Sequence, residues 1–172
     1  MRVFLVVVLL FVLLICASIF ALLSGNLALS VADVMGVIAY KLFGIGELSA
    51  TGEIVVWNLR VPRILIAILV GVSLACAGAI YQSIFRNPLV EPFILGASSG
   101  ASFGASLAIL LPSIFFSLEL SAFTFGLLAV FLAYTLAFER GVINSVALVL
   151  SGVIVGAIFS SLVGIMKYLS ED

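Results

Sequence analysis

Five runs of about 20 apolar residues dominate this sequence and determine the solvent in which it can fold. A helix needs roughly 20 mostly apolar residues to cross a bilayer. Of the 172 residues, 65% are hydrophobic and 9% charged, whereas soluble domains are about one quarter charged. We therefore predict an all-α, polytopic membrane helix bundle, with one transmembrane domain over residues 1–172. Its expected spans are residues 3–23, 61–84, 96–116, 120–138 and 145–166.

The segment between the first two runs has a different character. Ser30 is a favourable N-cap residue and Gly44 a favourable helix stop, so we predict a short helix over about 31–43. Its apolar residues lie along one side, which favours a helix on the external membrane surface rather than a further span. These apolar residues are Val34, Ile38 and Leu42. Gly46-Glu47 and Gly52-Glu53 then predict a polar connection into the second span.

Charged residues are few, and none lies well inside a predicted span. The formal net charge is −1 and there is no histidine, which excludes a basic nucleic-acid surface and leaves no imidazole base or metal cluster. Carriers coupled to ions or protons usually keep ionisable groups near the middle of the membrane. We therefore expect no catalytic residue, cofactor or metal, and a passive path, a scaffold or a machine powered by another subunit.

Small residues recur every fourth position in three of the spans, which places them on one helix face. In lipid, close packing of small residues drives helix association. Such a face either packs the bundle internally or lines a subunit interface or a transport pathway, and the pattern alone does not choose. The residues are Ala67, Gly71, Ala75 and Ala79 in the second span, Gly96, Gly100 and Gly104 in the third, and Gly152, Gly156, Ser160 and Gly164 in the fifth.

Two polar motifs flank the second span. In Arg60-Val61-Pro62-Arg63, the proline suits the first turn of a helix, and the two arginines lie three apart on one face. They either extend to lipid headgroups or recognise carboxylates. The second motif is Asn87-Pro88-Leu89-Val90-Glu91-Pro92, in which Pro88 ends the helix. Taken alone, it is either a plain rigid turn or part of a functional loop.

In this order and spacing, the two motifs resemble the iron–siderophore, haem and vitamin B12 importer permeases, the membrane subunits of type II ABC importers. A weaker third segment is Leu148-Val149-Leu150-Ser151-Gly152-Val153. The resemblance covers nearly the whole chain but only the first half of the family. It implies a multi-pass protein of a prokaryotic cell membrane, with the N-terminus, Asn87 and Arg140 inside, and Arg60 and the C-terminus outside. Basic residues alone do not define this orientation.

The same resemblance implies roles for particular residues. Arg60 and Arg63 would dock acidic residues of an external substrate-binding protein. Asn87 and Leu89 would form part of a cytoplasmic gate, with a second element at Asn144 and Ser145. The fifth span would lie beside the central pathway. The implied partners are cytoplasmic ATPase subunits, the external binding protein and a second permease copy in a homodimer.

The family continues through a second set of helices that completes the pathway and contacts the ATPase. We therefore expect a truncated chain, a split gene or a partial reading frame. The function predicted is that of a permease fragment in an importer for ferric siderophore, haem or cobalamin-type cargo, working by alternating access. ATP hydrolysis would reside in a separate subunit, so this chain would be no enzyme. The alternatives are a non-transporting membrane scaffold, a passive channel and a gradient-driven carrier.

Overall fold

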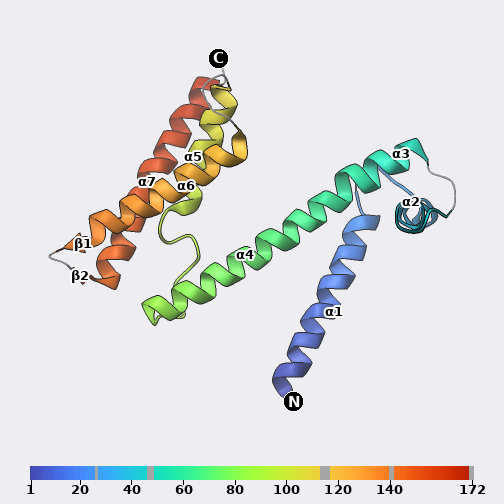
Figure 1. Cartoon of the computed structure of the whole chain (residues 1–172), viewed down its shortest axis with the longest axis horizontal. Coiled ribbons are helices and arrows are strands. Elements are labelled where there is room, and N and C mark those ends of the chain that lie inside the picture. Colours follow the sequence, from blue (N-terminus) through green and yellow to red (C-terminus); the bar gives the residue numbers. More distant parts are fainter. Residues whose placement is uncertain (26, 46–48, 113–116, 140–141, 171–172) are drawn as a thin grey trace. The chain divides into compact units, whose positions relative to one another are not determined.

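The computed structural model describes residues 1–25, 27–45, 49–112, 117–139 and 142–170, and most of these are helical (Figure 1). This confirms the predicted all-α membrane fold. The chain divides into two compact units, Met1–Ser73 and Leu74–Asp172, and helix α4 belongs partly to each. Gly46, Glu47 and Arg140 lie outside the described residues.

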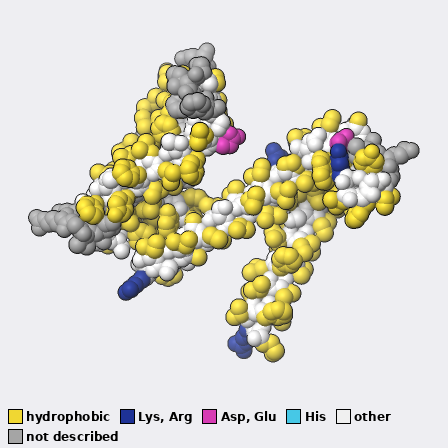
Figure 2. All heavy atoms as spheres, viewed as in Figure 1, with side chains coloured by type: hydrophobic (Ala, Val, Ile, Leu, Met, Phe, Trp, Pro, Cys, Tyr) yellow, Lys and Arg dark blue, Asp and Glu magenta, His cyan; other side chains and the backbone are white. Residues whose placement is uncertain are grey.

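The first unit begins with helix α1, Arg2–Leu23, whose side chains are all at least partly exposed. Its 22 residues give a length of about 33 Å at a rise of about 1.5 Å per residue. That length matches a hydrocarbon core of about 30 Å. Figure 2 shows hydrophobic side chains over the visible face of α1, as expected for a helix in contact with lipid. The other helices of this unit are α2 (Val31–Phe43), α3 (Ala50–Gly52), the π-helix η1 (Glu53–Arg60) and the first part of α4 (Val61–Phe85).

Helix α2 begins and ends at the residues that the sequence indicates. The Ser30 hydroxyl accepts the Asp33 backbone N–H at 3.1 Å, and Asp33 Oδ2 accepts the Ser30 N–H and O–H at 3.0 and 2.6 Å, completing a capping box. The hydrogen bond from the Ser30 hydroxyl, and to a smaller extent the one from its backbone N–H, lowers the pKa of the Asp33 carboxyl. The ionised Asp33 carboxylate therefore stabilises the fold at pH values above the ordinary pKa of an aspartate. This contribution is lost as the pH falls through the lowered pKa of Asp33. Gly44 ends the helix at φ +70°.

Helix α2 packs against η1 through a small core. Val34, Val37 and Val56 are each at most 2% exposed and form its centre. Of the apolar side predicted for α2, Val34 is buried in this core, Ile38 packs against it, and Leu42 is 62% exposed. The last turn of α2 also contacts η1, because the Lys41 ammonium group pairs with the Glu53 carboxylate.

Segments α3, η1 and α4 form one continuous helical stretch of 36 residues, Ala50–Phe85. The predicted connection at Gly52 and Glu53 was therefore wrong, and Pro62 lies inside a helix rather than in its first turn. An internal proline lacks an N–H and clashes with the carbonyl four residues earlier. The π-helical stretch ends at Arg60, two residues before Pro62, and the Val61 N–H donates to the Val56 carbonyl, five residues back. This wider pairing adapts the backbone to the proline.

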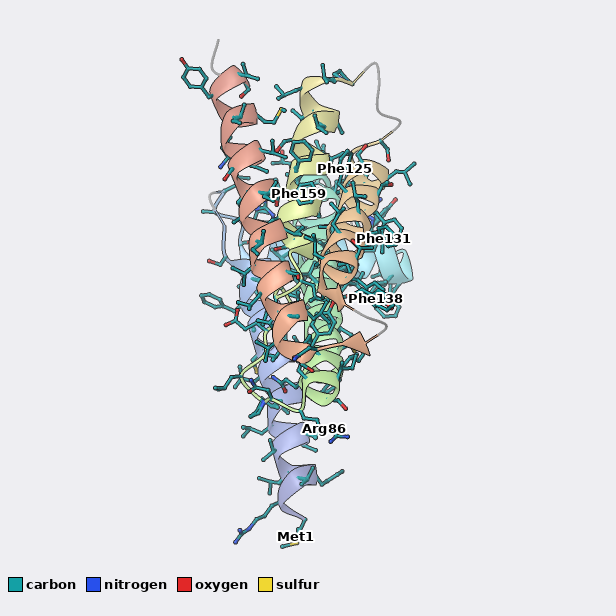
Figure 3. All side chains as sticks on the ribbon, turned by 90° about the vertical axis from the view of Figure 1, so that its left-hand side faces the viewer. Met1, Arg86, Phe125, Phe131, Phe138 and Phe159 are labelled. Atoms are coloured by element: carbon teal, nitrogen blue, oxygen red, sulfur yellow. The ribbon has the colours of Figure 1, made fainter. Side chains whose placement is uncertain are left out.

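Helix α4 ends in a tight cap at Arg86, which is labelled in Figure 3. Arg86 has φ +48°, its N–H donates to the Ser83 carbonyl, and the Asn87 N–H donates to the Gln82 carbonyl. This is the Schellman pattern, in which glycine is the usual left-handed residue. Pro88 then prevents further helix.

Because a left-handed residue with a side chain carries roughly 1–2 kcal/mol of strain, we expect Arg86→Gly to stabilise the protein by about 1 kcal/mol. Arg86→Ala is the matched control, since it removes the same charge and keeps the strain. Unfolding midpoints in mixed detergent would measure both variants. Equal midpoints for the two variants would show that backbone strain at Arg86 is not the cause.

The second unit is a three-helix assembly built around aromatic rings. Phe103 of α5 contacts Phe125 of α6 edge-on at 5.3 Å and Phe159 of α7 at 5.6 Å between ring centroids (Figure 3). Ala129 and Ala133 are fully buried between these helices. The helices are α5 (Ala97–Leu110), α6 (Leu118–Ala137) and α7 (Ser145–Ser170), with a short hairpin of β1 (Phe138–Glu139) and β2 (Val142–Ile143) between the last two.

Four helical stretches of the described residues are long and apolar enough to cross a membrane, namely α1, Ala50–Phe85, α6 and α7. Helix α5 has 14 residues, or about 21 Å, and is shorter than the run predicted over 96–116. Helix α5 ends at Leu110 because Leu111 is the residue before Pro112, and a residue in that position disfavours helical geometry.

Candidate functional site

The two arginines of the first motif lie in different environments. The Arg60 guanidinium donates from Nη1 to the Leu22 carbonyl at 2.6 Å and from Nη2 to the Leu27 carbonyl at 2.7 Å. Arg63 is exposed and makes no hydrogen bond or ion pair within the part of the chain that the structure describes. We call Arg60 and Arg63, together with the backbone at Leu22, Gly25 and Leu27, the arginine corner.

A cavity of about 590 Å³ opens at the arginine corner. Arg60 and Arg63 both line it, and most of its other walls are apolar residues of α1, η1 and α4. Helix α1, which is long and apolar enough to cross a membrane, ends at this cavity. The arrangement suits a charged group that is approached from the membrane surface.

The second motif lies beside helix α7 in the second unit. Leu89 is 84% exposed and lines a cavity of about 350 Å³ together with Gly96, Gly152 and Gly156. The motif therefore shares one cavity with residues predicted to belong to the pathway. Glu91, Phe93 and Ser99 line the same cavity and were not singled out from the sequence.

The loop that carries the second motif is anchored at both ends. Gln82 of α4 donates to the Val90 carbonyl at 3.5 Å, and Val90 is buried. A Cβ on Gly78 would contact Pro92 at 3.8 Å, so α4 and the loop are in close contact. At the other end, a Cβ on Gly96 would lie 3.0 Å from the Gly156 nitrogen, so the loop backbone lies directly against α7.

The remaining predicted gate residues are used locally. The Asn87 side chain accepts the Leu89 N–H at 3.0 Å, which fixes the turn after α4. Asn144 does the same at the start of α7 by accepting the Val146 N–H at 2.8 Å. Ser145 is the first residue of that helix. None of these three lines the cavity that contains Leu89.

The small residues of the second unit have different surroundings. Gly100 and Gly104 of α5 face α6, where a Cβ on Gly100 would lie 2.6 Å from Ala129 Cβ and one on Gly104 would lie 2.8 Å from the Ser121 carbonyl carbon. At Gly164, by contrast, an added Cβ would have no atom of the described residues within 4 Å. The stripe on α5 packs helices within the chain, whereas Gly164 leaves an open face.

A polar face on α5 and α7 was not predicted. The Ser160 hydroxyl donates to the Ser99 hydroxyl at 3.1 Å, and both residues line a cavity of about 300 Å³ with Ser102 and Lys167. The sequence signal is the recurrence of serine at three- and four-residue spacings along α5, which places the hydroxyls on one side. These serines are Ser98, Ser99, Ser102 and Ser106.

Long apolar helices, backbone-to-backbone packing and polar turns at the helix ends define a multi-pass membrane protein. The chain belongs to the FecCD transport family, whose model matches residues 10–172. This confirms the family resemblance carried by the two motifs. Members of the family are transport permease subunits, which are not themselves catalytic, and the protein is a multi-pass protein of the cell membrane.

Several permeases are similar to this chain. The molybdate import permease MolB of Haemophilus influenzae is 35% identical over 92% of this chain and 47% of its own length. The cobalamin import permease BtuC of Halobacterium salinarum is 43% identical over 70% of this chain and 33% of its own length. The heme-iron transport permease IsdF of Staphylococcus aureus is 36% identical over 95% of this chain and 48% of its own length.

A solved structure described as a metal-chelate type ABC transporter, in an inward-facing conformation, has the same fold. It superposes with a TM-score of 0.66 at 34% identity, over 92% of this chain and 46% of that one. The chain thus spans about half the length of the relatives that it matches.

Proposed function

We propose that this chain forms part of the membrane-spanning permease of an ATP-driven importer for ferric siderophore, haem or cobalamin-type cargo. The observation that carries the proposal is the contact between α7 and the motif loop, where Gly96, Gly152 and Gly156 surround one cavity with Leu89. Backbones that meet without intervening side chains can shift against each other by small movements. Such contacts suit a pathway that opens and closes by rigid-body motion of helices.

Within this proposal, Leu89 and the turns at Asn87, Asn144 and Ser145 form the cytoplasmic gate. Leu89 supplies an exposed apolar side chain, and the two asparagines hold the adjoining turns in fixed geometry. Gly152, Gly156 and Ser160 lie along the pathway side of α7. Ser99, Ser102 and Ser160, which line one cavity between α5 and α7, give the pathway side of α7 hydroxyl groups that a polar cargo can contact.

The proposal extends to partners. The arginine corner docks an external substrate-binding protein, cytoplasmic ATPase subunits supply the energy, and a second permease copy completes the assembly. The open surface at Gly164, and the equally open one at Gly71, provide faces on which further helices can pack. The relatives named above support an import function, and the names of two of them specify cobalamin and heme-iron.

The test is transport by an importer reconstituted in liposomes from this chain, the remainder of the permease and an ATPase. We expect uptake that requires ATP and the binding protein and that persists when ionophores abolish ion gradients. The control is the same preparation supplied with ADP. Uptake driven by an ion gradient without ATP would identify a gradient-driven carrier instead and would refute the proposal.

A further inference from the structure

The Arg60 side chain closes the junction between α1 and the loop that follows it. Its two acceptors, the carbonyls of Leu22 and Leu27, lie on either side of the point where α1 ends. The carbonyls in the last turn of a helix have no partner within the helix, and they carry its partial negative charge. A guanidinium group satisfies them with charge-assisted hydrogen bonds, which are stronger than neutral ones.

Gly25 makes this arrangement possible. A Cβ at Gly25 would lie 2.6 Å from Arg60 Nη2, 3.0 Å from Cζ and 3.2 Å from Nε. The guanidinium therefore lies against the loop backbone in the space that any side chain at this position would fill. The position of Arg60 is determined from both sides, by two acceptors and by a residue without a side chain.

Arg63 differs from Arg60 in having no hydrogen-bond partner for its guanidinium group among the described residues. It lies one helical turn further along and lines the same cavity, but it has no partner among the residues described. Glu53, an acidic residue on the adjoining η1, already pairs with Lys41. The charge of Arg63 is therefore available to an outside group, whereas that of Arg60 is engaged.

We propose that Arg60 is a positioning residue that clamps the end of α1 and its loop to η1. This leaves Arg63 as the arginine that is free to bind a carboxylate in the docking function proposed above. This rests on the proposed docking function only for the role of Arg63. The clamp depends on the forked geometry of arginine, because its two acceptors are separate carbonyls. Lysine offers a single ammonium group and does not reproduce the fork.

The first experiment measures hydrogen exchange at the end of α1, where the Ser24 N–H donates to the Phe20 carbonyl, in the whole chain in detergent. We expect Arg60→Lys to accelerate exchange by about tenfold or more, since bonds to charged groups contribute roughly 1.5–3 kcal/mol. Gly25→Ala should have the same effect without changing any charge, because it displaces the guanidinium. Arg63→Gln should leave exchange unchanged, as should the control Gly36→Ala, whose added Cβ meets no described atom within 4 Å.

The second experiment measures docking of the binding protein to the reconstituted importer at several salt concentrations. We expect Arg63→Gln to weaken docking about tenfold and to reduce its salt dependence, while Arg60→Lys retains the salt dependence. Unchanged exchange in Arg60→Lys, or equal acceleration in Arg63→Gln, would overturn the clamp. Unchanged docking in Arg63→Gln would overturn its recognition role. If no binding protein docks to the unaltered importer, the docking function itself fails, and the exchange experiment still decides the clamp.

Discussion

Replacing Gly152 by alanine is expected to lower the free energy of unfolding by about 3 kcal/mol, at the upper end of what one added methyl group costs in a packed interior. The new Cβ would overlap the Ile94 carbonyl oxygen and would lie 2.8 Å from Leu95 Cα. These are backbone atoms, so no rotation of a side chain relieves the contact. Helix α7 or the motif loop has to move, and the cavity that they share with Leu89 changes shape.

The measurement is the midpoint of unfolding in mixed detergent, followed by circular dichroism. Gly164→Ala is the matched control, because it makes the same substitution in the same helix at a position with no described atom within 4 Å. We expect Gly164→Ala to be neutral or slightly stabilising, as alanine is the better helix former. A Gly152→Ala midpoint equal to that of Gly164→Ala would mean that α7 and the loop are not in backbone contact.

Local signals in the sequence were sufficient for helix α2 and for the family. Ser30 and Gly44 bound α2 because capping depends on residues within one turn. The two motifs around the second span led to the correct family because their order and spacing are distinctive. Both inferences use short stretches of chain in which the chemistry of each residue is sufficient.

Contacts between distant residues could not be predicted in this way. The acceptors of Arg60 are backbone carbonyls 33 and 38 residues away, and every residue has such a carbonyl. The π-helical stretch before Pro62 likewise has no periodic pattern that distinguishes it from an ordinary helix or a polar connection. The sequence therefore singles out the two arginines but does not show which of them is engaged by the rest of the chain.

The small-residue stripes show the same limit. Spacing by four predicts Gly96, Gly100 and Gly104 on one helix face, but it does not identify what packs there. In the structure Gly100 and Gly104 meet α6, Gly96 meets α7, and Gly164 meets no described atom. Which glycine can accept a side chain is therefore a property of the packed helices and not of the pattern.

The crossing of α5 and α6 provides the second large effect, and here we expect Gly104→Val to cost more than about 3 kcal/mol. A Cβ on Gly104 would overlap the Ser121 carbonyl oxygen and would lie 2.8 Å from its carbon and 2.9 Å from Phe125 Cβ. Valine adds two more methyl groups to that overlap, so the two helices have to separate. Separation would also loosen the ring contact between Phe103 and Phe125.

Gly71→Val is the control for this substitution, because Gly71 is also in a membrane helix and an added Cβ there meets no described atom within 4 Å. It makes the same change in helix propensity without the collision, so we expect an unfolding midpoint close to that of the unaltered chain. Near-ultraviolet circular dichroism of the aromatic cluster should change in Gly104→Val alone. If the two variants lose stability equally, helix propensity accounts for the loss, and close approach of α5 to α6 is not what holds the second unit together.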